Sequence, residues 1–271
     1  MYKVLEPLHA MIYFAPEAQA EYTALGLDNQ AKGYFPSRGA ALGRASAAVV
    51  AAAFYSFSPA LVGYGMAGVW DEHSPEELVA ARLRAVDAAL RRMCGDLVDD
   101  VAAPLALVRE AAAACPPEGR ALHAGQAALA EPSTDLLALW HGIAVLREFR
   151  GDGHLTALLA AGITAPQSLV LQGAFHGAGM EAFLKATRGW SPEQWDGARA
   201  ELVDRGWLDV DGALTDAGTA ARDDVEAVTD RLALAPWARL GAEGTGRLGA
   251  LLQPLSDAVV ASGGLPVARR R

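Results

Sequence analysis

The chain has 271 residues, enough for one large domain or two ordinary ones with substantial cores. Apolar residues make up 52% of the sequence and charged residues 20%, which excludes an intrinsically disordered chain. The formal net charge of −9 argues against a protein that coats nucleic acid, so any DNA-binding face has to be local.

The sequence also predicts a reduced, cytoplasmic protein. The two cysteines, Cys94 and Cys115, form no CxxC motif. The N-terminus lacks a basic region followed by a long apolar run, so we expect no signal peptide. The apolar run ASAAVVAAAF is too short to span a bilayer, so no membrane partner is expected. We expect the final ARRR to be a solvated tail.

Two helices are predicted from the same start signal. They are SPEELVAARLRAVDAALRRM, which begins at Ser74, and SPEQWDGARAELVDRG, which begins at Ser191. In each, the serine is the expected N-cap, proline takes the first helical position, and Glu or Gln follows three residues after the cap. Gly206 is the expected C-terminal stop of the second helix.

These helices belong to a longer internal similarity. Both halves contain, in the same order, Arg-Gly, Phe, Gly-Met, Trp and Ser-Pro-Glu. The order indicates a duplicated helical unit, although alanine-rich helices also resemble one another by composition alone. The segment AAAACPPEGRALHAGQAALAEPSTD is punctuated by proline and glycine, so we place the boundary between a domain of residues 1–125 and a domain of residues 126–271 there.

A small hairpin is predicted after the second Ser-Pro helix. Residues 207–210 alternate as a short strand does, Asp211-Gly212 is a tight-turn signal, and residues 213–215 can form the returning strand before a long helix. The segment LVDRGWLDVDGALTDAG resembles the winged helix of MarR-type regulators. Most of the chain resembles an uncharacterised actinobacterial family of helix-turn-helix proteins, through MIYFAPEA, GYFPSRGAALG and LREFRGDGH.

These resemblances imply a mainly α fold of two related helix-turn-helix units, the C-terminal one a winged helix with a β-hairpin wing. MarR-type regulators act as dimers, so the duplicated chain is expected to be a monomeric pseudo-dimer or a homodimer.

The charge of the predicted recognition helix opposes DNA binding. Residues 191–206 carry four carboxylates against two arginines, a net −2, and the predicted wing, 207–216, carries three aspartates and no cation, a net −3. In the first unit, residues 74–92 carry four arginines, Arg82, Arg84, Arg91 and Arg92, against three acids, a net +1. A basic patch and a solvated helix face both remain open there.

Ionisable residues gather around LREFRGDGH. We expect a helix from residue 135 to residue 149, a left-handed Gly151 that ends it, and a second helix that Asp152 caps. This joint is either purely structural or a site. In the second case, Arg147 and Arg150 would hold an anion, with Arg38 and Tyr34 supplying matching groups from the first unit.

Acid–base and aromatic groups complete the hypothetical site. His154 and His141 are candidate acid–base residues, oriented by Asp152 or Glu148. Phe54, Tyr55 and Trp140, with Tyr34, can line a pocket for a flat ligand or simply form core. A metal held by His141, Glu148, Asp152 and His154 lacks any supporting spacing, so neither a metal nor a cofactor is predicted.

The sequence thus predicts a protein that binds a small aromatic or anionic molecule between its units, or an enzyme acting on one, with DNA binding lost from the C-terminal unit. The alternative is a ligand-responsive, DNA-binding regulator of MarR type. A structural, partner-binding role is the third possibility.

Overall fold

The computed structural model describes residues 1–265, which are almost entirely helical; the predicted solvated tail lies outside them. The α-helices are α1 (Tyr2–Ala10), α2 (Pro16–Ala24), α3 (Gln30–Gly39), α4 (Ala47–Phe54), α5 (Pro59–Met66), α6 (Val69–Glu72), α7 (Pro75–Cys94), α8 (Ala102–Ala112), α9 (Ala121–Ala128), α10 (Asp135–Ala160), α11 (Ala165–His176), α12 (Ala178–Arg188), α13 (Pro192–Asp204), α14 (Asp216–Leu232) and α15 (Ala235–Ala261). Three short 3-10 helices, η1 (Met11–Tyr13), η2 (Ala40–Leu42) and η3 (Gly95–Val98), complete the fold.

The two helices with the shared start signal are confirmed. The Ser74 hydroxyl accepts a hydrogen bond from the backbone of Glu77 at 3.1 Å and begins α7. At α13, the Ser191 hydroxyl accepts from the Gln194 backbone at 3.2 Å, and the Gln194 side chain accepts from the Ser191 backbone at 3.0 Å. This reciprocal pair satisfies two amide groups that the first helical turn leaves open. The duplication of the two units stays a prediction.

Helix α10 runs without interruption through the predicted joint, so the helix break at Gly151 is wrong. Asp152 does not cap a following helix, because its carboxylate accepts a hydrogen bond from the His123 backbone at the start of α9, at 3.0 Å. Gly153 serves packing, since a Cβ there would lie 2.7 Å from Arg120 Nη1 and 3.3 Å from Leu232 Cβ. Gly153 therefore lets α14 and the Arg120 side chain, at the N-cap of α9, approach α10 closely.

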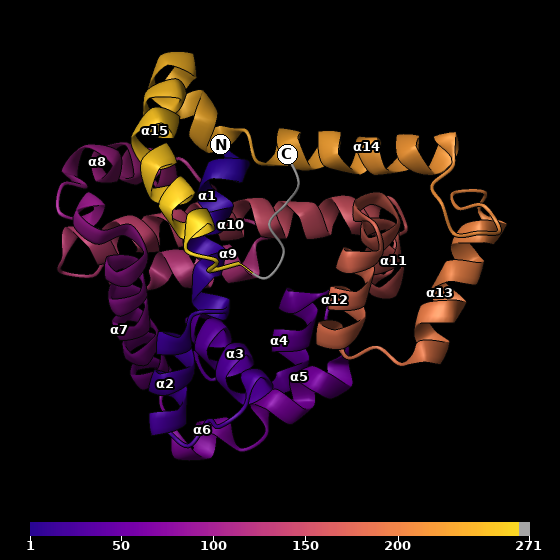
Figure 1. Cartoon of the computed structure of the whole chain (residues 1–271), viewed down its shortest axis with the longest axis horizontal. Coiled ribbons are helices and arrows are strands. Elements are labelled where there is room, and N and C mark those ends of the chain that lie inside the picture. Colours follow the sequence, from indigo (N-terminus) through magenta and orange to yellow (C-terminus); the bar gives the residue numbers. More distant parts are fainter. Residues whose placement is uncertain (266–271) are drawn as a thin grey trace.

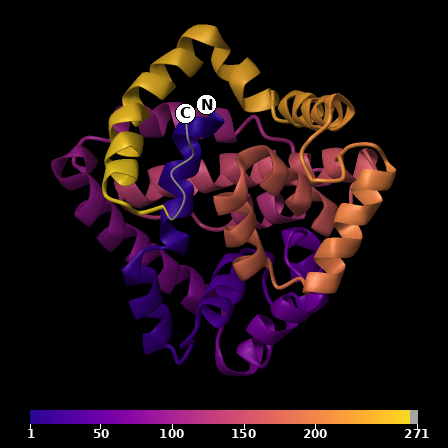
Figure 2. The ribbon, with the colours of Figure 1, turned by 45° about the vertical axis from the view of Figure 1, so that its right-hand side comes forward.

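Helix α10 connects two hydrophobic cores. It crosses the centre of the molecule, with α14 above it and α11 to α13 at one end (Figure 1). Residues 136–146 of α10 pack into a large core with α1, α3, α7, α8 and α15, whereas Ala157 and Leu158 pack into a second core with α11, α13 and Leu208. The turned view in Figure 2 shows α10 enclosed by the other helices. The domain boundary near residue 125 stays a prediction.

The second core supports a helix-turn-helix. A turn of three residues, Gly189 to Ser191, joins α12 to α13, and Gly189 adopts the left-handed conformation with φ of 72°. A short turn that contains glycine is typical of this motif. Helix α11 packs against both α12 and α13, so the three helices form one compact unit.

The predicted β-hairpin wing is wrong, because no strand occurs in residues 1–265. Only one antiparallel bridge, between Leu208 and Leu214, is present where the wing was expected. The Asp209 carboxylate accepts hydrogen bonds from the backbones of Asp211, at 3.0 Å, and Ala213, at 2.8 Å. Two backbone hydrogen bonds still cross the turn, from Asp209 to Ala213 at 2.9 Å and from Thr215 to Trp207 at 3.1 Å, but the Asp209 carboxylate takes the Ala213 amide, and the pairing does not extend beyond the single bridge. The resemblance to MarR-type regulators depended on this wing, so it is not confirmed.

No single helix in the described residues is long and apolar enough to cross a membrane; the bent pair α10 and α11, with 103° between them, passes that test only when taken together.

We predict that Gly125→Ala in α9 destabilises the fold. The new Cβ would lie 2.4 Å from the Ala41 carbonyl oxygen in η2, so α9 has to move away, at a cost of about 1–3 kcal/mol. Gly197→Ala in α13 is the matched control, because no atom lies within 4 Å of its Cβ position. There we expect stabilisation by up to about 1 kcal/mol. Equal free energies of unfolding for the two variants would contradict the close seating of α9.

Candidate functional site

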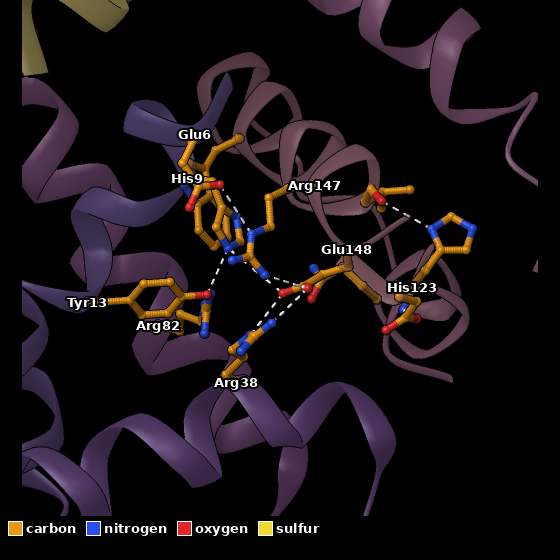
Figure 3. Close-up of polar contacts among 12 residues, drawn as sticks. Glu6, His9, Tyr13, Arg38, Arg82, His123, Arg147 and Glu148 are labelled. Carbon is orange, nitrogen blue, oxygen red and sulfur yellow. Dashed lines mark hydrogen bonds and ion pairs between the residues drawn. The ribbon is translucent and has the colours of Figure 1, made fainter. Parts of the chain in front are cut away.

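A carboxylate buried in the middle of α10 organises the site. Glu148 is only 2% exposed. Arg38 of α3 donates to both of its oxygens, with Nε 2.9 Å from Oε1 and Nη2 2.8 Å from Oε2. Arg147 Nη1 donates to Oε2 at 2.9 Å. Figure 3 shows the two guanidinium groups converging on this carboxylate. A paired fork of this kind fixes both the charge and the orientation of the arginine.

Electrostatic attraction among Glu148, Arg38 and Arg147 keeps all three side chains ionised. Burial raises the pKa of Glu148, but Arg38 and Arg147 outweigh burial and hold that pKa well below its usual range. Burial lowers the pKa of Arg38, and the attraction of Glu148 reverses this effect and raises it. For Arg147, Glu6 and Glu148 likewise overcome burial and raise the pKa well above its ordinary value. Glu148 is therefore an anion at any physiological pH.

A second part of the site lies beside this ion pair and lacks a carboxylate of its own. His9 Nε2 lies 2.7 Å from the Tyr13 hydroxyl, and Arg82 Nη2 donates to the same hydroxyl at 3.1 Å. The Arg82 side chain is buried, and its guanidinium lies 5.2 Å from the ring centroids of both Tyr13 and Trp140. No ion pair joins Arg82 to a carboxylate anywhere in residues 1–265. The Tyr13 hydroxyl and two aromatic faces therefore take the place of a counter-ion for Arg82.

Arg188 adds a further cation without a carboxylate. It is the last residue of α12, and its guanidinium stacks 4.5 Å from the Phe57 ring centroid and 5.5 Å from that of Phe183. Burial is the largest cause of its lowered pKa, and repulsion from Arg38 and Arg147 adds to it. The Phe57 ring also packs on Tyr34, with 5.3 Å between the ring centroids, and the Tyr34 hydroxyl accepts from Arg38, so two aromatic rings link Arg188 to the Arg38 guanidinium.

We call this cluster the basic centre; it comprises Glu6, His9, Tyr13, Arg38, Arg82, Arg147, Glu148 and Arg188. Four guanidinium groups face two carboxylates, because Arg147 Nε also contacts Glu6, at 3.3 Å. His9 adds no charge, since burial and then Arg147 hold its pKa well below the usual value. The centre therefore carries about two uncompensated positive charges in a poorly hydrated environment.

Several polar atoms of the basic centre have no partner. His9 Nδ1, Arg82 Nη1 and Arg188 Nε are buried and make no hydrogen bond within the described protein. Nearly all buried polar groups in folded proteins are satisfied, so three open nitrogen atoms in one cluster need an explanation. Of these three residues, Arg82 lines a small cavity between α3, α7, α9 and α10, and its open Nη1 suits a partner that accepts a hydrogen bond.

Five of the residues predicted for a ligand site come together here. Besides Arg38 and Arg147, the Tyr34 hydroxyl accepts from Arg38 Nη1 at 3.0 Å, and the Phe54 ring lies 4.4 Å from the Arg38 guanidinium. Trp140 stacks on His9 with 5.7 Å between the ring centroids. The aromatic residues thus cover the arginines, in addition to forming core.

The other predicted site residues lie elsewhere along α10. Arg150 pairs with Glu226 of α14 at 2.8 Å, and His154 Nδ1 lies 3.0 Å from the Thr229 hydroxyl. Both side chains therefore join α10 to α14. The catalytic role of His154 stays a prediction, and burial is the largest cause of its lowered pKa.

Three further predicted residues are also separate from the ion pair. Asp152 contacts α9, and burial raises its pKa. His141 Nδ1 lies 3.2 Å from Gln126 Nε2, and burial lowers its pKa. The Tyr55 hydroxyl donates to the Ile163 carbonyl. The catalytic roles of Asp152 and His141 stay predictions. Within residues 1–265, no group of three His, Cys, Asp or Glu side chains is placed to hold a metal ion.

Sequence reasoning missed part of the basic centre. Tyr13, Glu6 and Arg188 carry no local signal, since their partners lie far away along the chain. Arg82 did carry one, because it follows Leu78 by four residues and precedes Ala85 by three, which places it on the apolar face of α7. Its burial also prevents it from reaching a DNA phosphate.

Comparison with known proteins places the chain in a family. Residues 1–266 match the sequence profile of a helix-turn-helix family, and the chain belongs to that family. No curated protein and no solved structure matches the chain significantly.

We predict that Glu148→Gln strongly destabilises the protein. The variant leaves the Arg38 guanidinium buried without its counter-ion, which costs about 3–5 kcal/mol. Glu131→Gln is the matched control, since Glu131 pairs with Arg109 in an exposed contact at 2.6 Å; exposed pairs contribute about 0–1 kcal/mol. Urea unfolding measures both. A Glu148→Gln variant as stable as the control would contradict a structural role for the buried carboxylate.

We also predict that stability falls as the pH drops below about 6.5. Burial lowers the pKa values of His9, His141 and His154, so the unfolded chain binds more protons in this range. Each histidine that stays neutral in the fold contributes up to about 1.4 kcal/mol per pH unit. Chemical denaturation of His9→Asn should therefore show a shallower pH dependence than that of the wild-type chain. An unchanged slope in His9→Asn would refute this.

Proposed function

We propose that this helix-turn-helix family member binds a small organic anion at its basic centre and acts as a ligand-responsive, regulator-like protein. The observation that carries the proposal is the charge imbalance: four largely buried guanidinium groups face two carboxylates, and three buried nitrogen atoms have no partner. Such an arrangement is costly in the empty protein, and a bound anion offsets the cost by pairing the charge and accepting the open hydrogen bonds.

The path from the basic centre to the helix-turn-helix runs through Arg188. Its guanidinium belongs to the centre, and its carbonyl accepts from the Ser58 backbone at 2.9 Å, at the start of the motif's turn. Two residues further, Trp190 Nε1 donates to the Ser56 carbonyl at 2.9 Å. These contacts attach the turn to the segment between α4 and α5. An anion that pairs with Arg188 therefore acts directly on the position of the turn.

The expected result of ligand binding is a rise in stability. Ligand that binds only the folded protein adds about 2.7 kcal/mol at one hundred times its dissociation constant. Thermal unfolding with a panel of carboxylates, phosphates and sulfonates, at constant ionic strength in chloride, measures this. At least one organic anion should stabilise the protein in a saturable manner, and its uncharged analogue should not. If every anion behaves like chloride, the ligand-binding function is excluded.

The second candidate function is a DNA-binding regulator, and family membership supports it more directly than it supports ligand binding alone. The three-residue turn between α12 and α13 fits it as well. The surface charge opposes it, because the two arginines of α13 and its following turn are already engaged: Arg199 pairs with Glu181 at 3.0 Å, and Arg205 stacks on Trp207. The remaining exposed charges of residues 191–216 are carboxylates.

We predict weak duplex binding through this surface, with a dissociation constant in the non-specific range of about 10⁻⁴–10⁻⁶ M. Fluorescence polarisation with labelled duplexes from the gene's own upstream region tests this at low and at physiological salt. The control is Glu193→Gln with Asp196→Gln, which removes two exposed acids of α13 and should strengthen binding. Nanomolar, sequence-selective binding by the wild-type chain would establish the regulator and contradict the electrostatic argument.

A further inference from the structure

We propose that the small cavity beside Arg82 binds a single chloride ion, which serves as the counter-ion that the fold does not give this arginine. The cavity lies between α3, α7, α9 and α10, and its polar lining consists of Ser37, Arg82, Gln126 and His141. Among the described residues, no carboxylate lines it. The inference goes beyond the proposed function, because a chloride ion at Arg82 leaves the positive charge of Arg188 for an organic anion.

Arg82 lacks both a negative partner and an acceptor for one of its hydrogen-bond donors. Only 7% of the residue is exposed, and a guanidinium keeps its charge inside a protein. Its Nη2 donates to the Tyr13 hydroxyl, whereas its Nη1 is buried without a partner. The rings of Tyr13 and Trp140 offset part of the charge, but they leave Nη1 open. An anion in the cavity would supply the missing charge and the missing acceptor.

The size of the cavity restricts its occupant to a single atom or a water molecule. Its volume is about 20 Å³, and about 10–15 Å³ is needed for one water molecule. Polyatomic anions such as acetate and phosphate are therefore excluded, whereas a chloride ion is only slightly larger than water. Val79, Leu83 and Leu129 make much of the remaining lining apolar. This surrounding favours chloride over fluoride, because fluoride holds its hydration shell more strongly.

The polar lining favours a chloride ion over a water molecule. The Gln126 amide nitrogen can only donate, so its 3.2 Å contact makes Nδ1 of His141 the acceptor and places the imidazole proton on Nε2. The same amide carries a second hydrogen, so Arg82, Gln126 and His141 together supply several donors and one positive charge. A water molecule would accept from Arg82 Nη1 but add no charge, whereas chloride accepts several donors and neutralises the guanidinium.

The test replaces gluconate by chloride at constant ionic strength and follows the thermal unfolding of the full chain. Gluconate is too large for the cavity, so the unfolding temperature should rise saturably with chloride, and bromide should produce a similar rise. Arg82→Met should abolish this rise. Arg84→Met is the matched control, because Arg84 lies two residues along α7, is exposed, and pairs with Glu21 at 2.7 Å; it should keep the rise.

A second variant protects the test against misfolding. If circular dichroism shows that Arg82→Met does not fold, Gln126→Leu takes its place and should weaken chloride binding at least threefold. An unfolding temperature of the wild-type chain that does not depend on chloride would overturn the inference, since water would then fill the cavity. An undiminished rise in the folded Arg82→Met variant, or in Gln126→Leu when that variant replaces it, would also overturn it. Neither result bears on the proposed function, which the panel of organic anions tests separately.

Discussion

The ion pair between Arg38 and Glu148 is the interaction on which the rest of the structure depends. It joins α3 to α10, between residues separated by 110 positions, with both side chains largely buried. Burying two charges costs several kcal/mol each, and only a paired geometry with satisfied lone pairs offsets that cost. Glu148 meets this condition because Arg147 also donates to it.

The carboxylates of the basic centre neutralise only part of its positive charge. Glu148 and Glu6 balance Arg38 and Arg147, so the charges of Arg82 and Arg188 are left over. Arg82 lies beside a small cavity, and Arg188 ends the helix that leads into the helix-turn-helix turn. Under the proposed function, pairing of this surplus charge at Arg188 would link anion binding to the turn of the helix-turn-helix.

Local signals predicted the helices well, whereas contacts between distant residues decided the rest. Ser74 and Ser191 began their helices as expected, because capping depends on neighbours in sequence. The predicted helix break at Gly151 is absent. Asp152 was expected to cap a second helix, but its carboxylate accepts a hydrogen bond from the backbone of His123 in α9, and no local sequence pattern reveals this contact. The predicted wing does not form as a pair of strands, because the Asp209 carboxylate accepts hydrogen bonds from the backbone amides of Asp211 and Ala213.

The candidate site was likewise only partly predictable from the sequence. Arg38 and Arg147 stood out as anion anchors by residue type, but their common partner became visible only in the fold. Tyr13 and Arg188 could not be predicted as site residues from the sequence. Their contacts, with Arg82 and with Phe57, join residues that lie far apart along the chain. Arg82 was interpreted as a surface cation, although its spacing in α7 pointed to the core.

A double-mutant cycle between Arg38→Met and Glu148→Gln tests the central claim most directly. The free energies of unfolding of wild type, both single variants and the double variant give the coupling energy of the pair. We predict a coupling energy above about 2 kcal/mol, because each single change leaves the other charge buried and alone. Additive effects, with a coupling energy below about 0.5 kcal/mol, would contradict the account.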